Sequence, residues 1–265
     1  MFCTYRTCSD QCVEVTEALQ WIALSRPDVV LQTKSTKPES ISRGLLPSGS
    51  AMVVFQAKAW RTEWARVHDR TISNSDVQFL DVGSGDGSVL LTVSVVTAGP
   101  DGPRRVAGIE HTPGVHATSI EWLTRVGREC PVMSDAVADI QRNIFCRDAT
   151  SSVDLHVVRC FGEADVIFIN NLCFGATLQT GGRTINMQLT DSMMKFCTVK
   201  ATPTLIITTA ALTGVNDRTL MVLHGNLLAQ VGSFEIDRSG YNWGREGVPL
   251  TLYMHTITRG PSPGQ

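Results

Sequence analysis

The sequence predicts an α/β protein with a mainly parallel, doubly wound sheet, and three observations support this prediction. The chain has 265 residues, enough for one such domain with an extension. Its 43% hydrophobic and 18% charged residues are typical of a globular protein and exclude a disordered chain or a charged coiled coil. From residue 77 onward, short apolar runs alternate with helical stretches, which is the pattern of parallel strands connected by helices.

The residues before this alternation divide into two predicted parts. Residues 1–40 are expected to be a partly helical N-terminal extension, because apolar residues recur at helical spacing from Val15 to Ile22 and a polar linker follows. Residues 41–76 form the helical beginning of the main domain, with a helix over about residues 51–70. The main domain is therefore expected to cover residues 41–259.

The core of this domain, residues 77–259, is expected to hold a seven-stranded sheet. Six strands are predicted at 77–82, 105–109, 165–169, 204–208, 233–236 and 250–257, and a short one just before Asp148. The runs at 165 and 204 lack period-two alternation, which is typical of central strands covered on both faces. The last two runs are separated by one short loop and should form an antiparallel pair. Residues 260–265 are predicted to be a disordered tail.

Charge and hydropathy exclude several partners. The 23 basic and 25 acidic residues leave a formal charge of -2, which excludes attraction of the whole molecule to DNA. No stretch approaches the ~18 apolar residues of a membrane span and the first residues are too polar for a signal peptide, so we expect an intracellular protein without membrane contact. The local basic concentration is Lys58, Arg61, Arg66 and Arg70. We interpret it as a solvated helix face, with a weak phosphate contact as the alternative.

Cysteine spacing argues against a metal site. The eight cysteines lie mostly among apolar neighbours and are expected to be reduced, buried thiols. Cys3, Cys8 and Cys12 cluster, but they lack the paired short spacing of a zinc ribbon and have no nearby His. We therefore expect no metal.

A glycine-rich turn follows the first predicted strand. The segment 79–90, FLDVGSGDGSVL, is a buried strand, a tight turn and a helix start. In a doubly wound sheet this turn lies at the carboxyl edge, where ligands bind, and glycines such as Gly83 and Gly85 let the backbone approach closely. A dinucleotide fingerprint requires glycine where Ser88 stands, so the pattern argues against NAD.

Acidic residues around this turn favour a different cofactor. Asp81, placed before the first glycine, would repel a pyrophosphate but can pair with an amino-acid ammonium group, which suits S-adenosylmethionine. Glu110 ends the second strand and is placed to accept hydrogen bonds from both ribose hydroxyls, which fits either cofactor. Asp148 and the adjacent Ala149 follow the third strand, where Asp148 can reach the adenine amino group. The alternative is a simple strand-to-helix turn with solvated acids.

Two asparagines, Asn170 and Asn171, follow the fourth strand beside the same crevice. An amide supplies an acceptor and two donors without charge, so it can orient an attacking amine or the methionyl part of the cofactor. The alternative interpretation is that the pair caps the next helix.

Three separated blocks resemble the DOT (disruptor of telomeric silencing) family of histone H3 lysine methyltransferases. The glycine turn from Asp81 to Ser88 is similar to the family's cofactor motif. The block 166–175, VIFINNLCFG, resembles the family's IFVNNFAFG, which is more specific. The third block joins 241–243, YNW, to Pro249 and 252–257, LYMHTI, and is similar to the family's ending. The blocks keep the family's order and spacing over about two thirds of the chain.

The resemblance implies a Rossmann-like, class I S-adenosylmethionine-dependent methyltransferase. It implies that the cofactor is held by residues of the first three strand ends, namely Asp81, Gly83, Gly85, Ser88, Glu110, Asp148 and Ala149. It places Asn170 where cofactor and target amine meet, with Phe174 and Trp243 as walls of a lysine channel and Tyr253 as a further ring. Ser88 stands where the family often has glutamine, Leu172 replaces an aromatic residue, and Leu252 replaces a tyrosine.

The function expected from this resemblance is methylation of a lysine in the core of nucleosomal histone H3, in the nucleus, by in-line transfer to a neutral amine. The nucleosome would then be the partner, with weak DNA contact through the basic cluster that begins at Lys58. Two alternatives stay open: a methyltransferase for another protein, an RNA or a small-molecule amine, and a non-catalytic partner that only binds the cofactor.

Overall fold

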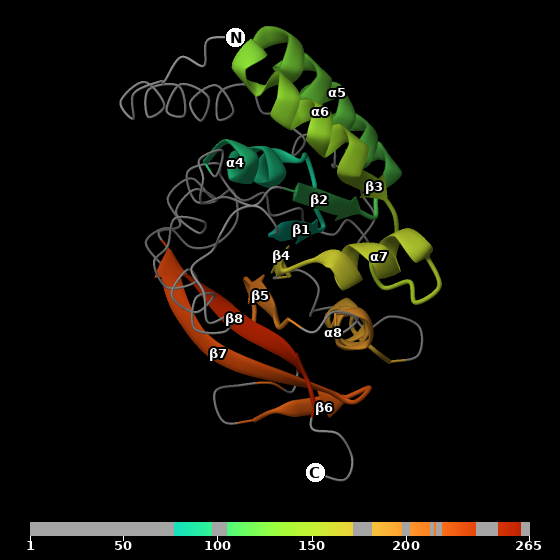
Figure 1. Ribbon diagram of the computed structural model, residues 1–265, viewed down its shortest axis with the longest axis vertical. Coiled ribbons are helices and arrows are strands. Elements are labelled where there is room, and N and C mark those ends of the chain that lie inside the picture. The colour runs from blue at the N-terminus through green and yellow to red at the C-terminus, as the bar shows by residue number, and fades with distance from the viewer. Residues whose placement is uncertain are drawn as a thin grey trace.

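The computed structural model describes residues 77–96, 105–171, 182–197, 202–212, 215, 219–236 and 249–260. The strands are β1 (Gln78–Val82), β2 (Arg105–Glu110), β3 (Ile144–Cys146), β4 (Val166–Ile169), β5 (Thr204–Thr208), β6 (Met221–Leu223), β7 (Asn226–Ile236) and β8 (Leu250–Arg259). The helices are α4 (Ser88–Val96), α5 (Pro113–Glu129), the 3-10 turn η2 (Pro131–Met133), α6 (Ser134–Asn143), α7 (Leu155–Glu163) and α8 (Ile185–Phe196). These strands form one sheet, in the order β3-β2-β1-β4-β5-β8-β7-β6 (Figure 1).

The sheet has a parallel part and an antiparallel part, as predicted. Strands β1 to β5 are parallel, and β8 pairs antiparallel with both β5 and β7. The described residues hold eight strands rather than the seven predicted, because β6 forms a hairpin with β7 and β7 begins at Asn226 instead of 233. The hairpin turns through His224 and Gly225, both with positive φ (54° and 73°), the geometry of a type I′ turn.

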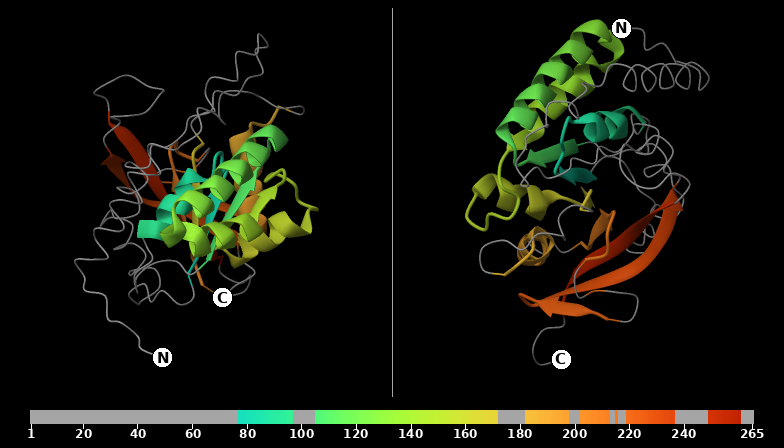
Figure 2. Two further views of the ribbon diagram at one scale, coloured as in Figure 1. Left: turned by 90° about the horizontal axis from the view of Figure 1, so that it is seen from above. Right: turned by 180° about the vertical axis from the view of Figure 1, so that it is seen from behind.

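Two helical layers cover the parallel strands (Figures 1 and 2). Phe79 and Phe168 pack with buried residues of α4, α5 and α6 on one face, whereas Leu80 and Ile167 pack with residues of α7 and α8 on the other. Every residue of β4 and β5 is buried, which confirms that these are central strands. The continuous apolar runs are explained by this double covering.

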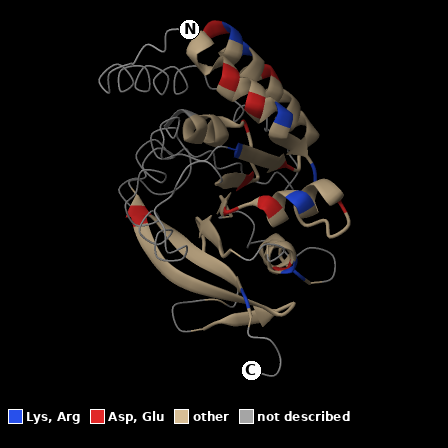
Figure 3. Ribbon diagram, in the orientation of Figure 1, with Lys and Arg blue, Asp and Glu red and all other residues tan. Residues whose placement is uncertain are grey.

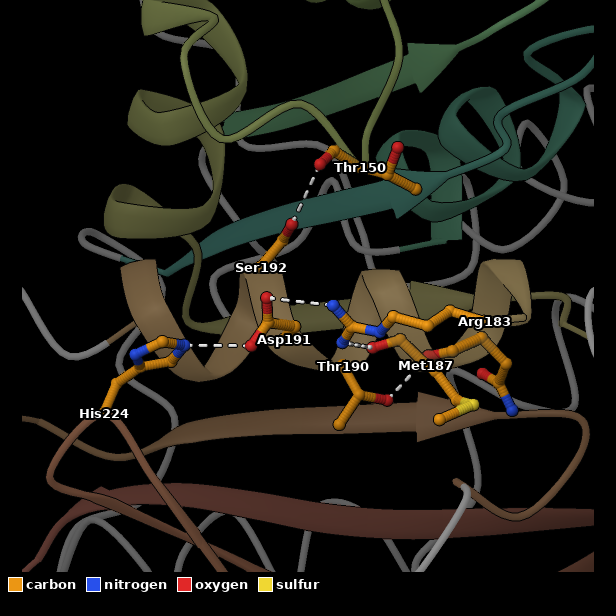
Figure 4. Close-up of polar contacts among 8 residues, drawn as sticks. Thr150, Arg183, Met187, Thr190, Asp191, Ser192 and His224 are labelled. Atoms are coloured by element: carbon orange, nitrogen blue, oxygen red, sulfur yellow. Dashed lines mark hydrogen bonds and ion pairs between the residues drawn. The ribbon is translucent and has the colours of Figure 1, made fainter. Parts of the chain in front are cut away.

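Helix α8 is tied to its surroundings by polar contacts of Asp191 and Ser192 (Figure 4). Asp191 forms an ion pair with Arg183 at 3.8 Å, and its Oδ1 lies 2.9 Å from Nε2 of His224 in the β6–β7 hairpin. Ser192 donates a hydrogen bond to the carbonyl of Thr150, in the loop after β3, at 3.3 Å. The helix is thus anchored to two segments that are distant in sequence.

The cysteines of the described ranges form no disulfide, and they differ in burial. Cys197 is buried, whereas Cys130, Cys146 and Cys160 are half-buried, so the expected full burial holds for one of the four. Burial is the largest of the causes that raise the pKa of Cys160 to about 11, which makes its thiolate scarce near neutral pH.

Several sequence predictions lie outside the described residues. These are the extension 1–40, the helical part 41–76, the Cys3 cluster, and the basic cluster of Lys58, Arg61, Arg66 and Arg70. Within the part of the chain that is described, no helix combines the length and the apolar character required to cross a membrane.

Candidate functional site

The glycine turn lies directly after β1, at the carboxyl edge of the parallel strands. Gly83, Gly85 and Gly87 have φ of 79°, 56° and 78°, a region that other residues rarely adopt. The backbone N–H groups of Gly83 and Ser84 both donate to the carbonyl of Ile109, at 2.8 and 3.1 Å. The turn is therefore held against the end of β2 by two hydrogen bonds, and its glycine positions carry no side chains that would block a ligand.

A fourth glycine, Gly108 in β2, supports the turn from below. A Cβ added at this position would lie 2.7 Å from Cδ1 of Leu90 and 2.9 Å from Cβ and Oγ of Ser84. The strand thus has no room for a side chain where the turn and α4 pack on it. Sequence reasoning missed this residue, because a glycine within a strand carries no local sign of which neighbours approach it.

Asp81 is buried under the turn, on the α4 side of the sheet. Only 2% of its surface is exposed, and within the described part of the chain its Oδ2 has no hydrogen-bond partner. Its pKa is raised well above the ordinary value, first by burial and then by the charges of Asp86 and Glu110. A buried carboxyl of this kind is stabilised in its charged form when a cation lies against it.

Asp86 is a second buried acid that we did not predict to be part of the site. It is 1% exposed, and its Oδ1 accepts a hydrogen bond from the backbone N–H of Ser88 at 3.0 Å, so it caps the first turn of α4. Ser88, predicted to contact the cofactor, is itself 1% exposed, with its Oγ unpartnered among the described residues. Asp86 belongs to the glycine-rich segment 79–90, but its effect on the site follows from its burial near Asp81, whose pKa its charge raises.

Glu110 ends β2 and is fixed by two backbone groups. Its Oε2 accepts from the N–H of Gly85 at 3.0 Å, and its Oε1 accepts from the N–H of Thr112 at 2.7 Å. Each carboxylate oxygen has a second lone pair, so this arrangement orients the group and still allows it to accept from ribose hydroxyls. The direct link between Gly85 and Glu110 joins two residues that the sequence suggested separately.

Asp148 and Ala149 follow β3 next to Glu110. Cys146 pairs in register with Glu110, and the N–H of Arg147 donates to the Glu110 carbonyl at 3.0 Å. Asp148 is exposed, and its Oδ1 accepts from both the N–H and the hydroxyl of Thr150, at 2.9 and 2.7 Å. The structure thus brings Asp148 to the strand edge of Glu110, while its contact with adenine stays a prediction.

The two asparagines after β4 have different roles. Asn171 is 1% exposed; its Nδ2 donates to Oδ1 of Asn186 and to the carbonyl of Ala210, both at 3.0 Å, and its Oδ1 accepts from the N–H of Ala210 at 2.7 Å. It therefore clamps β4, the end of β5 and α8 together. Neither asparagine caps α8, whose N-cap is Thr184, accepting from the N–H of Met187.

Asn170 is half-buried, and its Oδ1 accepts a hydrogen bond from the hydroxyl of Thr209 at 2.9 Å. Thr209 directly follows β5 and is 3% exposed. Sequence reasoning missed Thr209, although a polar residue at the carboxyl end of a predicted parallel strand is the signal that identified Asn170. The amide is thus oriented by the neighbouring strand end.

The third sequence block is described in part. Tyr253 is half-buried and pairs in register with Thr208, which places it at the strand edge that also carries Asn170. Leu252 is fully buried in the core on the α4 side, where its side chain acts in packing. Phe174, Trp243 and Leu172 lie outside the described residues.

These features fit S-adenosylmethionine. A buried acid with an unpartnered oxygen matches the cofactor's positively charged amino group, and a turn of positive-φ glycines allows the backbone to approach the cofactor closely. Among the residues described here, no group of three His, Cys, Asp or Glu side chains is arranged to hold a metal ion.

Comparison with known proteins supports the fold. No protein-family model and no curated protein matches the sequence. A putative class I S-adenosylmethionine-dependent methyltransferase from Listeria monocytogenes is 11% identical, with 95% of this chain and 70% of that chain covered and a TM-score of 0.51.

Two RNA-modifying enzymes are more distant in structure. The rRNA methyltransferase aviRa from Streptomyces viridochromogenes is 14% identical, with 96% of this chain and 94% of that chain covered and a TM-score of 0.44. An RNA methyltransferase from Salinibacter ruber, solved with S-adenosylhomocysteine, is 15% identical, with 78% and 96% covered and a TM-score of 0.39. The Listeria protein and the strand order show that the fold of this chain is that of the class I S-adenosylmethionine-dependent methyltransferases.

Proposed function

We propose that the protein is an S-adenosylmethionine-dependent methyltransferase that transfers the methyl group to an amine. One observation carries the proposal: the Asp81 carboxyl, buried and with its Oδ2 unpartnered among the described residues, lies beneath a turn whose three glycines all have positive φ. This combination matches a ligand that carries a cationic amino group and closely approaches the backbone. It opposes a pyrophosphate, whose negative charge would face three buried acids.

Each residue of the crevice has a role in this proposal. Asp81 pairs with the cofactor's amino group, Glu110 accepts from the ribose hydroxyls, and Asp148 with Ala149 lies beside the adenine. Gly83 and Gly85 allow close backbone contact. When bound, S-adenosylmethionine supplies an electrophilic methyl carbon on a sulfonium, so the protein does not need a covalent nucleophile of its own.

Asn170 is the residue proposed to align the acceptor amine. The Thr209 hydroxyl donates to its Oδ1, so the amide is held at the carboxyl end of β4 before substrate arrives. Such prior alignment lowers the entropic cost of bringing two reactants together. Asn170→Ala should therefore lower turnover much more than cofactor affinity.

The acceptor that we propose is a lysine of nucleosomal histone H3, and the support is the sequence resemblance in the Asn170 and Tyr253 blocks. A lysine with a reference pKa of ~10.4 needs about 4.6 kcal/mol to become neutral at about pH 7, and an apolar channel beside the sulfonium reduces that cost. Phe174 and Trp243 are the proposed walls, with Tyr253 as a further ring. A nuclear location follows from this substrate.

Contact with a nucleosome would depend on a small surface rather than on net charge. The formal charge is -2, and acidic and basic residues are interspersed along α5 and α6 (Figure 3). We propose that Lys58, Arg61, Arg66 and Arg70 make the DNA contact. Few counterions would then be released, so affinity should depend weakly on salt; a slope equivalent to six or more phosphates would contradict this contact.

Transfer of radiolabelled methyl groups tests both levels of the proposal. Nucleosomes, free histones and bulk RNA are incubated side by side with the protein and labelled cofactor, with Asn170→Ala as the control. Label on histone H3 lysine supports the full proposal. Label on RNA or on another amine would overturn the histone assignment, and cofactor binding with no transfer to any acceptor would instead favour the non-catalytic alternative.

A further inference from the structure

We propose that the Asp81 carboxyl is protonated in the cofactor-free protein and releases its proton when the cofactor's amino group binds beside it. This inference rests on the proposed function. It means that one proton is released for each cofactor that binds. Cofactor affinity would then rise with pH over the range in which the free protein holds this proton.

The surroundings of Asp81 disfavour a negative charge. Its side chain is 2% exposed, and no group of the described ranges forms a hydrogen bond with its Oδ2. An ionised carboxylate that is removed from water needs hydrogen bonds or a counter-ion to offset its desolvation. A protonated carboxyl carries no net charge and avoids most of that cost.

The ionisable groups that face Asp81 make the charged form still less favourable. Asp86, in the turn, is 1% exposed, and Glu110, at the end of β2, is 8% exposed. Among the described elements, the neighbouring strand β4 (VIFI) and the helix α4 (SVLLTVSVV), which begins directly after the turn, contain no ionisable side chain. Arg105 stands at the opposite end of β2, where it pairs in register with Gln78.

The direction of the Asp81 pKa, which is raised by burial, by Asp86 and by Glu110 in that order, agrees with this picture. The amino group of the cofactor is cationic below its own pKa, which for an α-amino group is ~7.7 to 8.0. Placing that cation against Asp81 stabilises the carboxylate and expels the proton to solvent. By linkage, the release of one proton makes the association constant rise about tenfold per pH unit.

Calorimetric titration of the full chain with S-adenosylmethionine tests the inference. At about pH 5.5 a carboxyl with the reference pKa of ~3.9 is already ionised, so any release reports a raised one. The same titration in buffers of different ionisation enthalpy should give a release approaching one proton per cofactor. S-adenosylhomocysteine should give the same release, because it keeps the amino group and lacks only the methyl group and, with it, the sulfonium charge.

Two variants distinguish proton release by Asp81 from release by other groups of the protein. Asp81→Asn should abolish the release, whereas Asp135→Asn, at an exposed position in the first turn of α6, should leave it unchanged. Because Asp81→Asn is expected to weaken binding, infrared difference spectra supply a second measurement. Wild type should lose the carbonyl band of a protonated carboxylic acid when cofactor binds, and that band should be missing from Asp81→Asn before cofactor is added.

The outcomes distinguish this inference from the function on which it rests. Saturable cofactor binding without proton release, or with release retained in Asp81→Asn, would overturn the inference and leave the methyltransferase proposal intact. Release with S-adenosylmethionine but not with S-adenosylhomocysteine would also overturn it, because the amino group would not be the partner. A lack of binding by either molecule would instead refute the proposed function.

Discussion

Asn171→Ala should destabilise the protein much more than Asn170→Ala, although the two residues are adjacent. The Asn171 side chain is 1% exposed and joins four partners: Oδ1 of Asn186, the carbonyl and N–H of Ala210, and, at 3.3 Å, the hydroxyl of Thr209. Asn170 is half-buried, and its Oδ1 accepts a hydrogen bond from the Thr209 hydroxyl at 2.9 Å. The comparison therefore separates a structural amide from the amide that we propose to align the substrate.

The magnitude follows from the groups that lose their partners. Asn171→Ala leaves three polar atoms without these hydrogen bonds, because the Thr209 hydroxyl keeps its bond to Asn170. Each of the three costs about 1 to 3 kcal/mol if it stays buried. Ala210 is half-buried, so water can reach part of this set and reduce the total. We expect a loss of about 2 to 4 kcal/mol in the free energy of unfolding. Asn170→Ala should cost about 1 kcal/mol.

Urea denaturation followed by circular dichroism measures both losses under one condition. The two variants serve as controls for each other, because they remove the same group from neighbouring positions. Turnover should show the opposite order in the folded proteins, with Asn170→Ala the more damaging variant. An Asn171→Ala loss below about 1 kcal/mol, or no larger than that of Asn170→Ala, would refute the assignment of Asn171 as a clamp.

Three further predictions concern other parts of the sheet. Gly108→Ala should destabilise by about 1 to 3 kcal/mol, because the new Cβ would lie 2.7 Å from Leu90, whereas Gly114→Ala, with nothing within 4 Å, should be neutral or stabilising in the same urea assay. Burial lowers the pKa of His255 to about 4, so only the unfolded state gains a proton between about pH 6.5 and 4, and stability should fall as pH falls, by about 3 kcal/mol in all. His255→Leu should flatten that profile, and an unchanged profile would contradict the assignment. Thr209→Val should lower kcat about fivefold to tenfold at unchanged cofactor affinity, and Thr209→Ser should restore it; equal losses in both variants would indicate a structural role.

Much of the parallel sheet could be predicted from the sequence, because a strand that is buried on both faces has a continuous run of apolar residues. The continuous apolar runs of β4 and β5 identified central strands, and the glycines after β1 identified a turn at the carboxyl edge. The β6–β7 hairpin was missed because its type I′ turn is made by His224 and Gly225. The usual Asn-Gly or Asp-Gly signal is absent there.

The candidate site divides in the same way. The positions of Asp81, Glu110 and Asn170 at the carboxyl edge could be predicted because each is a polar residue at or next to the end of a strand, while their contacts with cofactor and substrate stay predictions. Asn186 could not, because it holds Asn171 from a helix 15 residues further on and nothing local reports that contact. Asp86 raises the pKa of Asp81, and this effect depends on the burial of both side chains, which the sequence motif does not reveal.

The most direct test of the central claim, that the glycine crevice binds S-adenosylmethionine, is equilibrium dialysis of the full chain against radiolabelled S-adenosylmethionine and, separately, NAD. We predict saturable binding of about one S-adenosylmethionine per chain and no saturable binding of NAD, because Asp81, Asp86 and Glu110 oppose a pyrophosphate. Gly83→Arg should abolish the binding in a variant that keeps the wild-type circular dichroism spectrum, since Gly83 has a φ of 79° in the turn. Binding of NAD in preference to S-adenosylmethionine, or unchanged affinity in folded Gly83→Arg, would contradict the account.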